Sequence, residues 1–281
     1  MKLRASYPVV DGVHHCLPPD RAEHYAQFLR EYTSVRLAEG RASDDPEYFR
    51  RLPEPTPGGP IEWQWRIRRC TWRTVRKKVL RAAPPALTVI DVGAGVGWFS
   101  NRAAELGHDA HAVDITVDEH DGLGAARHFL HHFERYQAEM DDLPFADATA
   151  DLVVYNASLH YSTDYGCTLA EGLRVLRPGG RLMVLETPIY RTRAAGDAMV
   201  AERHAQFEQQ YGTRSESVAS IEFLTDDMLA DLARDLGLEW RSFRTWYGWQ
   251  WAMRPWKARW HRRRPPSRFA VLVAVRPPGR A

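Results

Sequence analysis

The sequence predicts an α/β protein built on a doubly wound sheet of seven strands. Between residues 86 and 187, short runs of β-branched and apolar residues alternate with helical stretches, the pattern of a parallel sheet covered by helices. The first of these runs leads directly into a turn with three glycines, at residues 93–97. Hydrophobic residues make up 44% of the 281 positions and charged residues 26%, which is typical of a globular protein with a sizeable core.

The strands are short apolar runs bounded by turn residues. Five belong to the central region, and two follow it as closing strands. We expect them at residues 87–92, 110–114, 136–140, 151–156, 181–186, 238–246 and 268–275.

Two helices have well-marked ends. Residues 168–177 carry apolar side chains at helical spacing and stop at Pro178-Gly179-Gly180, a strong helix terminator. A later helix over 225–237 opens on Thr225, which can cap it, continues with acidic residues, and closes on Gly237.

The chain divides into four expected regions. The first has proline-rich breaks at 53–60 and then a long basic helix at 61–80, so it is predicted to be a cap rather than part of the sheet. A helix at 191–211 interrupts the strand pattern and is a candidate lid. We expect a helical N-terminal cap at 1–85, the core at 86–187, a helical lid insertion at 188–224 and the C-terminal completion of the core sheet at 225–281.

Several protein classes are disfavoured. No apolar run approaches the roughly 20 residues that span a bilayer, and the first residues lack the apolar stretch of a signal peptide, so a cytoplasmic location is expected. Cys16, Cys70 and Cys167 are widely separated, unlike a disulfide framework or a zinc site.

The glycine turn indicates a nucleotide-like ligand. Asp91 and Val92 precede Gly93, Gly95 and Gly97, where missing side chains let the backbone approach a ligand and the next helix offers free N–H groups. An acid that binds ribose is expected about 20 residues further on, and Asp114 occupies that place. Both NAD and S-adenosylmethionine fit these facts.

The glycine spacing separates the two cofactors. Dinucleotide sites use G-x-G-x-x-G, whereas this turn has G-x-G-x-G. With the segments 139–145, 151–160 and 173–180, it resembles the class I S-adenosylmethionine-dependent methyltransferases, in particular their small-molecule, menaquinone-methylase-like group (methyltransferase type 11). The resemblance covers residues 86–187 and implies a Rossmann-like sheet with an antiparallel last strand.

The resemblance implies a set of cofactor contacts. The turn would hold the methionine moiety, Asp114 the ribose with Ile115 beside it, and residues 139–141 the adenine edge; Asn156 would lie beside the sulfonium. Family members usually have Asp or Asn at position 139, so the adenine contact is open between Glu139, Asp141 and the Met140 backbone. The residues are Asp91, Gly93, Ala94, Gly95, Gly97, Asp114, Ile115, Glu139, Met140, Asp141 and Asn156.

Two side chains after the fourth strand are candidate catalytic groups. His160, with an ordinary pKa near 6.5, could accept a proton from the methyl acceptor, or it could be a packed or solvated loop histidine. Tyr161 is the second candidate. No metal is predicted, because Asp141 and Asn156 already have places in the implied cofactor site and the paired histidines do not share a face.

The expected partner is a small organic methyl acceptor, modified at oxygen, nitrogen or carbon. Nucleic-acid methylation is the first alternative, but residues 156–159 read Asn-Ala-Ser-Leu and lack the Pro-Pro-aromatic element of amino-methylating enzymes. A repurposed cofactor-binding protein is the second. The basic, tryptophan-containing segment 254–264 is expected to dock its tryptophans on the core, with nucleic-acid or membrane-surface binding as the other interpretation. No membrane span and no oligomeric state are predicted.

Overall fold

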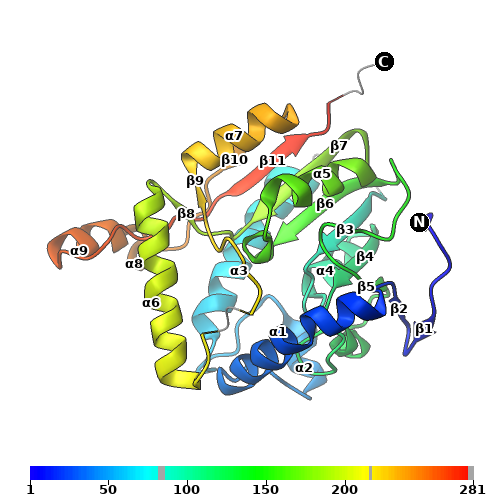
Figure 1. Cartoon of the computed structure of the whole chain (residues 1–281), viewed down its shortest axis with the longest axis horizontal. Helices are drawn as coiled ribbons and strands as arrows, with labels where there is room; N and C mark the ends of the chain where they lie inside the picture. Colours follow the sequence, from blue (N-terminus) through cyan, green and yellow to red (C-terminus); the bar gives the residue numbers. More distant parts are fainter. Residues whose placement is uncertain (82–85, 215–216, 278–281) are drawn as a thin grey trace.

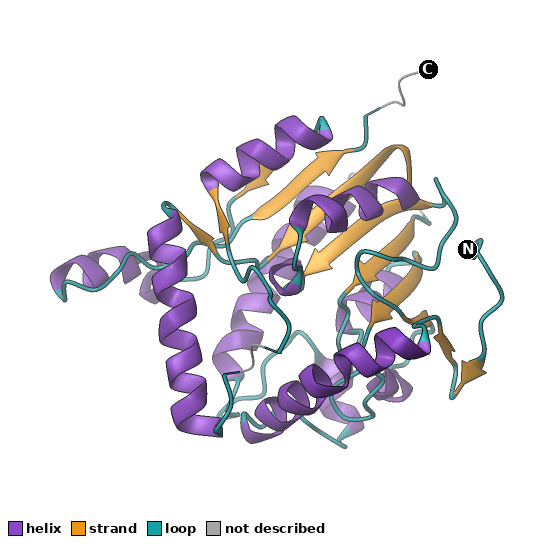
Figure 2. Ribbon diagram, viewed as in Figure 1, coloured by secondary structure: helices purple, strands orange, loops and turns teal. Residues whose placement is uncertain are grey.

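The computed structural model describes residues 1–81, 86–214 and 217–277. A single large sheet forms the centre of the molecule, and helices lie on both of its faces (Figure 2). The described residues contribute nine strands to this sheet, in the order β1-β2-β5-β4-β3-β6-β7-β11-β10. The strands are Val9–Val10 (β1), Val13–His15 (β2), Thr88–Val92 (β3), Asp109–Asp114 (β4), Glu134–Gln137 (β5), Ala150–Asn156 (β6), Leu176–Leu185 (β7), Arg241–Phe243 (β10) and Val271–Val275 (β11).

The strand directions confirm the α/β prediction. β2, β5, β4, β3, β6 and β7 are parallel to one another, and the last strand, β11, is antiparallel to β7. All seven predicted segments contain or overlap a strand. The predicted count of seven is wrong, because β1 and β2 extend the sheet beyond β5.

The two extra strands form a hairpin around Asp11 and Gly12. Both residues have positive φ angles, 50° and 74°, as a type I′ turn requires. Val10 pairs with Val13 across this turn. An Asp-Gly pair between β-branched residues is a strong hairpin signal, so the local sequence carried the information that the seven-strand prediction missed.

The helices differ from the prediction mainly at their ends. The cap helix α3 covers Glu62–Val75 and continues as a π-helical turn at Arg76–Leu80. The predicted helix before the proline-glycine turn is α5 (Tyr165–Val175); it ends before Pro178, which lies within β7. The other helices of four or more residues are α1 (Pro19–Ala38), α2 (Pro46–Arg51), α4 (Trp98–Glu105), α6 (Arg193–Tyr211), α7 (Asp226–Leu236), α8 (Trp249–Ala252), α9 (Arg254–Trp260) and the 3₁₀ helix at Leu123–His128.

The capping predictions for α7 are confirmed. The Thr225 hydroxyl accepts a hydrogen bond from the Met228 amide at 3.1 Å, and Gly237 ends the helix in the left-handed conformation. A two-stranded sheet of Ile189–Tyr190 (β8) and Leu224–Thr225 (β9) joins the two ends of the segment that contains α6. That segment therefore leaves and re-enters the body at one place.

Two apolar clusters hold the faces of the sheet. One includes Tyr155 with Leu169 of α5 and Leu229 of α7. The other includes Val154 with Trp72 of α3 and Phe99 of α4. Successive strand residues face opposite sides, so β6 is buried on both faces. Below the carboxyl ends of the parallel strands lies α1 (Figure 1). None of the helices in the described ranges is long and apolar enough to cross a bilayer.

Candidate active site

A cavity of about 390 Å³ lies at the carboxyl ends of the central strands. Its walls come from the loops after β3, β4 and β6, from α1 and α3, and from Pro188 and Val218. Ligands of open α/β sheets bind at this edge, where connections on either side diverge. Of the residues predicted for the site, all but Asp91 and Gly97 line the cavity.

The glycine turn requires residues that have no side chain. Gly93, Gly95 and Gly97 have φ angles of 69°, 55° and 80°, which are unfavourable for other residues. A Cβ at Gly93 would lie 2.3 Å from the Cβ of Ser158, whereas one at Gly95 would meet no atom within 4 Å. Gly97 begins α4 and faces Phe133. The turn thus leaves open space beside Gly95.

Asp91 lies behind this turn rather than in the cavity. It is fully buried in β3, and one carboxylate oxygen accepts a hydrogen bond from the Ser100 hydroxyl at 3.0 Å. Its other oxygen has no partner among the described residues. Burial raises the pKa of Asp91 from 3.8 to about 7.

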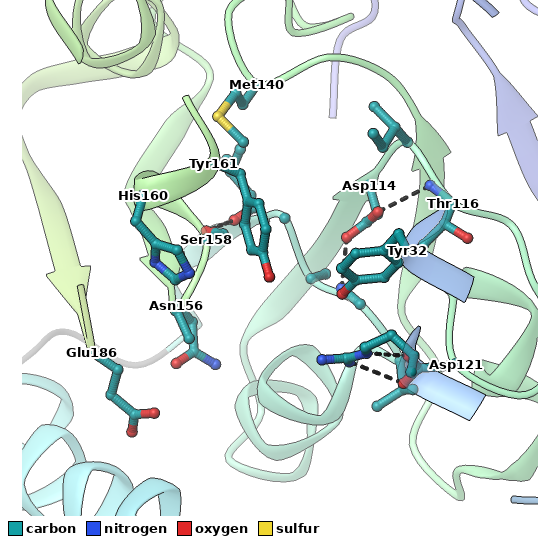
Figure 3. A pocket seen from close by; sticks show the side chains of 18 of the residues that line it. Tyr32, Asp114, Thr116, Asp121, Met140, Asn156, Ser158, His160, Tyr161 and Glu186 are labelled. Carbon is teal, nitrogen blue, oxygen red and sulfur yellow. Dashed lines mark hydrogen bonds and ion pairs between the residues drawn. The ribbon is translucent and has the colours of Figure 1, made fainter. Parts of the chain in front are cut away.

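Asp114 lies at the end of β4 and ties two loops together. Its carboxylate accepts hydrogen bonds from the amide of Gly95 at 2.7 Å and from that of Thr116 at 2.9 Å. Burial raises the pKa of Asp114, and these two bonds oppose the shift. Nearby, Arg36 of α1 pairs with Asp121, so α1 covers this side of the cavity (Figure 3).

Glu139 is held by two side chains of α1. Its carboxylate accepts hydrogen bonds from Arg21 Nε at 2.9 Å, Arg21 Nη2 at 2.6 Å and the Tyr25 hydroxyl at 2.7 Å. Burial opposes ionisation, but these bonds lower the pKa of Glu139 below its ordinary value. Met140 and Asp141 line the cavity without such ties.

Three polar side chains lie together at the other end of the cavity: Asn156, His160 and Glu186 (Figure 3). Asn156 Oδ1, His160 Nδ1 and Glu186 Oε1 are buried and have no hydrogen-bond partner among the described residues. Arg68 Nε lies 4.0 Å from Glu186 Oε2. Unpaired buried polar atoms cost free energy, so this end is suited to a ligand that supplies hydrogen bonds.

His160 is neutral over the physiological range. Burial, with the nearby cations Arg203 and Arg68, lowers its pKa from 6.5 to about 3. The structure thus does not support the ordinary pKa near 6.5 that the sequence analysis assumed. The adjacent Tyr161 ring lies 4.6 Å from the imidazole and 6.0 Å from the ring of Tyr32.

Comparison with known proteins adds to this geometry. Residues 90–184 match the family model described as "Methyltransferase domain". Over this segment the chain is similar to the methyltransferase family. The matched segment runs from β3 to β7, and it includes the glycine turn, Asp114 and Asn156.

Two O-methyltransferases are among the curated proteins that are similar to this chain. Malonyl-[acyl-carrier protein] O-methyltransferase of Hahella chejuensis is 29% identical over 168 residues, 53% of this chain and 58% of that protein. Fatty-acid O-methyltransferase of Mycolicibacterium smegmatis is 27% identical over 213 residues, 71% of this chain and 77% of that protein. The chain spans about half the length of the first curated relatives it matches.

A solved structure shares the fold of the matched segment and its surroundings. It is the Burkholderia thailandensis 1,6-didemethyltoxoflavin-N1-methyltransferase, with 1,6-didemethyltoxoflavin and S-adenosylhomocysteine bound. The TM-score is 0.51 at 18% identity, and the match covers 92% of each chain. The Rossmann-like, doubly wound architecture predicted from the sequence is confirmed, apart from the number of strands.

Several cavity residues were absent from the sequence prediction. Glu186 is predicted from the sequence only as the last residue of a strand, although acids at the carboxyl ends of parallel strands are candidates for ligand binding. Tyr32, Arg36 and Arg68 belong to the region predicted only as a cap, where no motif marks them. Among the described residues, no group of three or more His, Cys, Asp or Glu side chains could hold a metal ion.

Proposed function

We propose that this chain transfers a methyl group from S-adenosylmethionine to an oxygen, nitrogen or carbon atom of a small organic acceptor and releases S-adenosylhomocysteine. The observation that carries the proposal is the cavity itself. It joins the glycine turn and Asp114 of the methyltransferase domain to the buried polar cluster of Asn156, His160 and Glu186. Donor and acceptor would therefore meet in one enclosed space.

The residues present fit the cofactor. The open space at Gly95 admits the methionine end of the molecule, and Asp114 would bind the ribose hydroxyls through lone pairs that its two amide bonds leave free. Ile115 and Met140 supply apolar walls for the adenine. Glu139 would reach the adenine only by sharing its carboxylate with Arg21 and Tyr25, so we assign the polar adenine contact to Asp141 and the Met140 backbone.

The acceptor would lie between Tyr161 and the polar cluster. Held there, its nucleophilic atom can approach the methyl carbon in line, and such positioning alone supplies several kcal/mol of the barrier. Glu186 and Asn156 offer oxygen atoms that accept hydrogen bonds, which suits a methyl acceptor with a hydroxyl or amino group. The cap (1–85) and the 188–224 segment, through Val218 and Pro188, would exclude water, and no metal is needed.

The proposed acceptor class agrees with the relatives. Two of them are named for transfer to oxygen of malonyl-[acyl-carrier protein] and of fatty acids. All of the named acceptors are organic molecules or carrier-bound acyl groups, and none is a nucleic acid. We therefore rank nucleic-acid methylation below the small-molecule reaction.

Calorimetry tests the cofactor assignment. We expect S-adenosylmethionine and S-adenosylhomocysteine to bind and NAD not to bind. Asp114→Ala removes a charged hydrogen-bond acceptor, so it should weaken S-adenosylhomocysteine binding by about 10- to 100-fold. Asp109→Ala, at the opposite end of β4, is the matched control. Binding of NAD without either S-adenosyl ligand would overturn the proposal.

The pH dependence of turnover tests the role of His160. A methylation screen of candidate metabolites, read by mass spectrometry, first identifies an acceptor. Because the imidazole is neutral above about pH 3, His160→Ala should lower the rate by about tenfold without removing an ionisation near pH 6.5. A wild-type ionisation near pH 6.5 that is lost in the variant would make His160 a general base instead.

A further inference from the structure

A short arm of residues 246–264 projects from the body of the molecule. It contains α8 and α9, and α9 extends beyond α6 at the left edge of the view (Figure 1). None of its residues lines the cavity. We call this segment the Trp-Arg arm.

The tryptophans of the arm are exposed. Trp249, Trp256 and Trp260 have 76%, 74% and 86% of their surface exposed, and Trp246 has 60%. The sequence analysis expected the tryptophans of this segment to pack on the core, and for Trp256 and Trp260 that expectation is wrong. The two short helices, of four and seven residues, lie on a segment that projects from the body (Figure 1), so those rings do not reach the sheet. Met253 adds further exposed apolar surface.

One side of the arm is fixed to the body. The Trp251 ring lies 5.2 Å from that of Phe269, which lines the cavity. Arg254 stacks over Trp251 at 3.6 Å and donates a hydrogen bond to the Ser267 carbonyl at 2.8 Å. The exposed rings are therefore presented by an anchored element and not by a loose tail.

The arm is also strongly basic. It carries six Arg or Lys residues and no acid, although the whole chain has a net charge of only +2. Arg264 pairs with Glu202 of α6. Within the part of the chain that the structure describes, Lys257, Arg259, Arg262 and Arg263 have no carboxylate within ion-pair distance. Four cationic groups thus lie beside four exposed indoles.

We propose that the Trp-Arg arm binds the surface of an anionic phospholipid bilayer. Indole rings favour the boundary between headgroups and acyl chains, and Lys and Arg near the surface are attracted by anionic lipids. A projecting, anchored arm can reach a flat surface while the body stays in water. A single-stranded nucleic acid could use the cations and stack its bases on the indoles, but it would leave the exposed apolar surface of Met253 unexplained.

Vesicle binding of the full chain tests this proposal. We expect co-sedimentation with vesicles of equal parts phosphatidylglycerol and phosphatidylcholine, weak binding to phosphatidylcholine alone, and loss at high salt. Trp256→Ser with Trp260→Ser should reduce binding to the anionic vesicles by at least about tenfold. Arg259→Glu, Arg262→Glu and Arg263→Glu together should do the same. Because these side chains are exposed, the variants should fold normally.

Two controls make the result specific. Arg76→Glu, Lys77→Glu and Lys78→Glu together reverse an equal number of exposed charges on α3's π-helical turn and should leave vesicle binding unchanged. S-adenosylhomocysteine binding should be the same in the arm variants as in wild type, so this test does not depend on the proposed reaction. The proposal is overturned if anionic vesicles do not bind, or if binding survives the arm variants. It is also overturned if the arm residues instead mediate binding to single-stranded RNA or self-association without vesicle binding.

Discussion

Asp91 is a carboxyl group in the apolar centre of the sheet. Only one of its oxygens has a hydrogen bond from a described residue, and burial raises its pKa to about 7. Above the pKa of the unfolded chain, near 3.8, folding must therefore keep a proton on Asp91 or bury its charge. The contribution of the protonated Asp91 to the free energy of unfolding is therefore fully present below about pH 4. It is lost progressively as the pH rises through about 7.

The variant Asp91→Asn isolates this effect. It keeps the shape and the Ser100 hydrogen bond but cannot ionise, so it should gain stability relative to wild type between pH 4.5 and pH 8, by at most about 4 kcal/mol. Urea denaturation at both pH values measures the difference. Asp235→Asn, on the exposed face of α7, is the matched control. A relative stability of Asp91→Asn that stays constant with pH would contradict the prediction.

Where a backbone motif marks a residue, its position can be predicted from the sequence, while its role in binding the cofactor stays a prediction. The glycine turn and Asp114 follow from one strand, one turn and a known spacing, and the structure brings them into the cavity. Glu186 and Arg68 lie more than 100 positions apart in the sequence and approach each other only through the packing of α3 on the sheet. No local pattern records such a contact.

At the scale of elements, α1 is tied to the sheet by polar contacts. Its buried apolar residues are only Phe28 and Val35, whereas Arg21 and Arg36 each reach a carboxylate on the core. This composition explains why α1 has no clear amphipathic stripe. Helices that are marked by an apolar stripe and by caps, such as α7, were predicted closely.

Arg21→Ala should loosen α1. The buried carboxylate of Glu139 would lose its charged donor, which costs about 1–3 kcal/mol, with the lower end favoured because Arg21 is partly exposed. Hydrogen exchange of the amides in 19–38 should accelerate while the central strands stay protected. Arg30→Ala, on the exposed face of the same helix, should leave exchange unchanged. Equal acceleration in both variants would show that the Glu139 contact does not hold α1.

For the whole molecule, alternation of strands and helices was enough to predict the doubly wound architecture. It did not predict the sheet's width, because β1 is only two residues long and belongs to a hairpin ahead of the first helix. The four-region division remains a prediction; its first boundary lies at residues 82–85, outside the described residues. The exposure of the Trp-Arg arm could not be predicted from hydrophobic periodicity, because its short helices with exposed tryptophans do not follow the pattern of a packed element.

The width of the sheet has a consequence for solubility during folding and storage. An edge strand offers unpaired N–H and C=O groups to which another chain can add, and long flat edges promote aggregation. Here the outermost strands are Val9–Val10 and Arg241–Phe243, of two and three residues. Pro8 precedes the first of these strands and arginines begin and follow the second. Each edge strand is thus too short and too interrupted to pair with strands of other chains. The apolar central strands would promote aggregation if they were exposed.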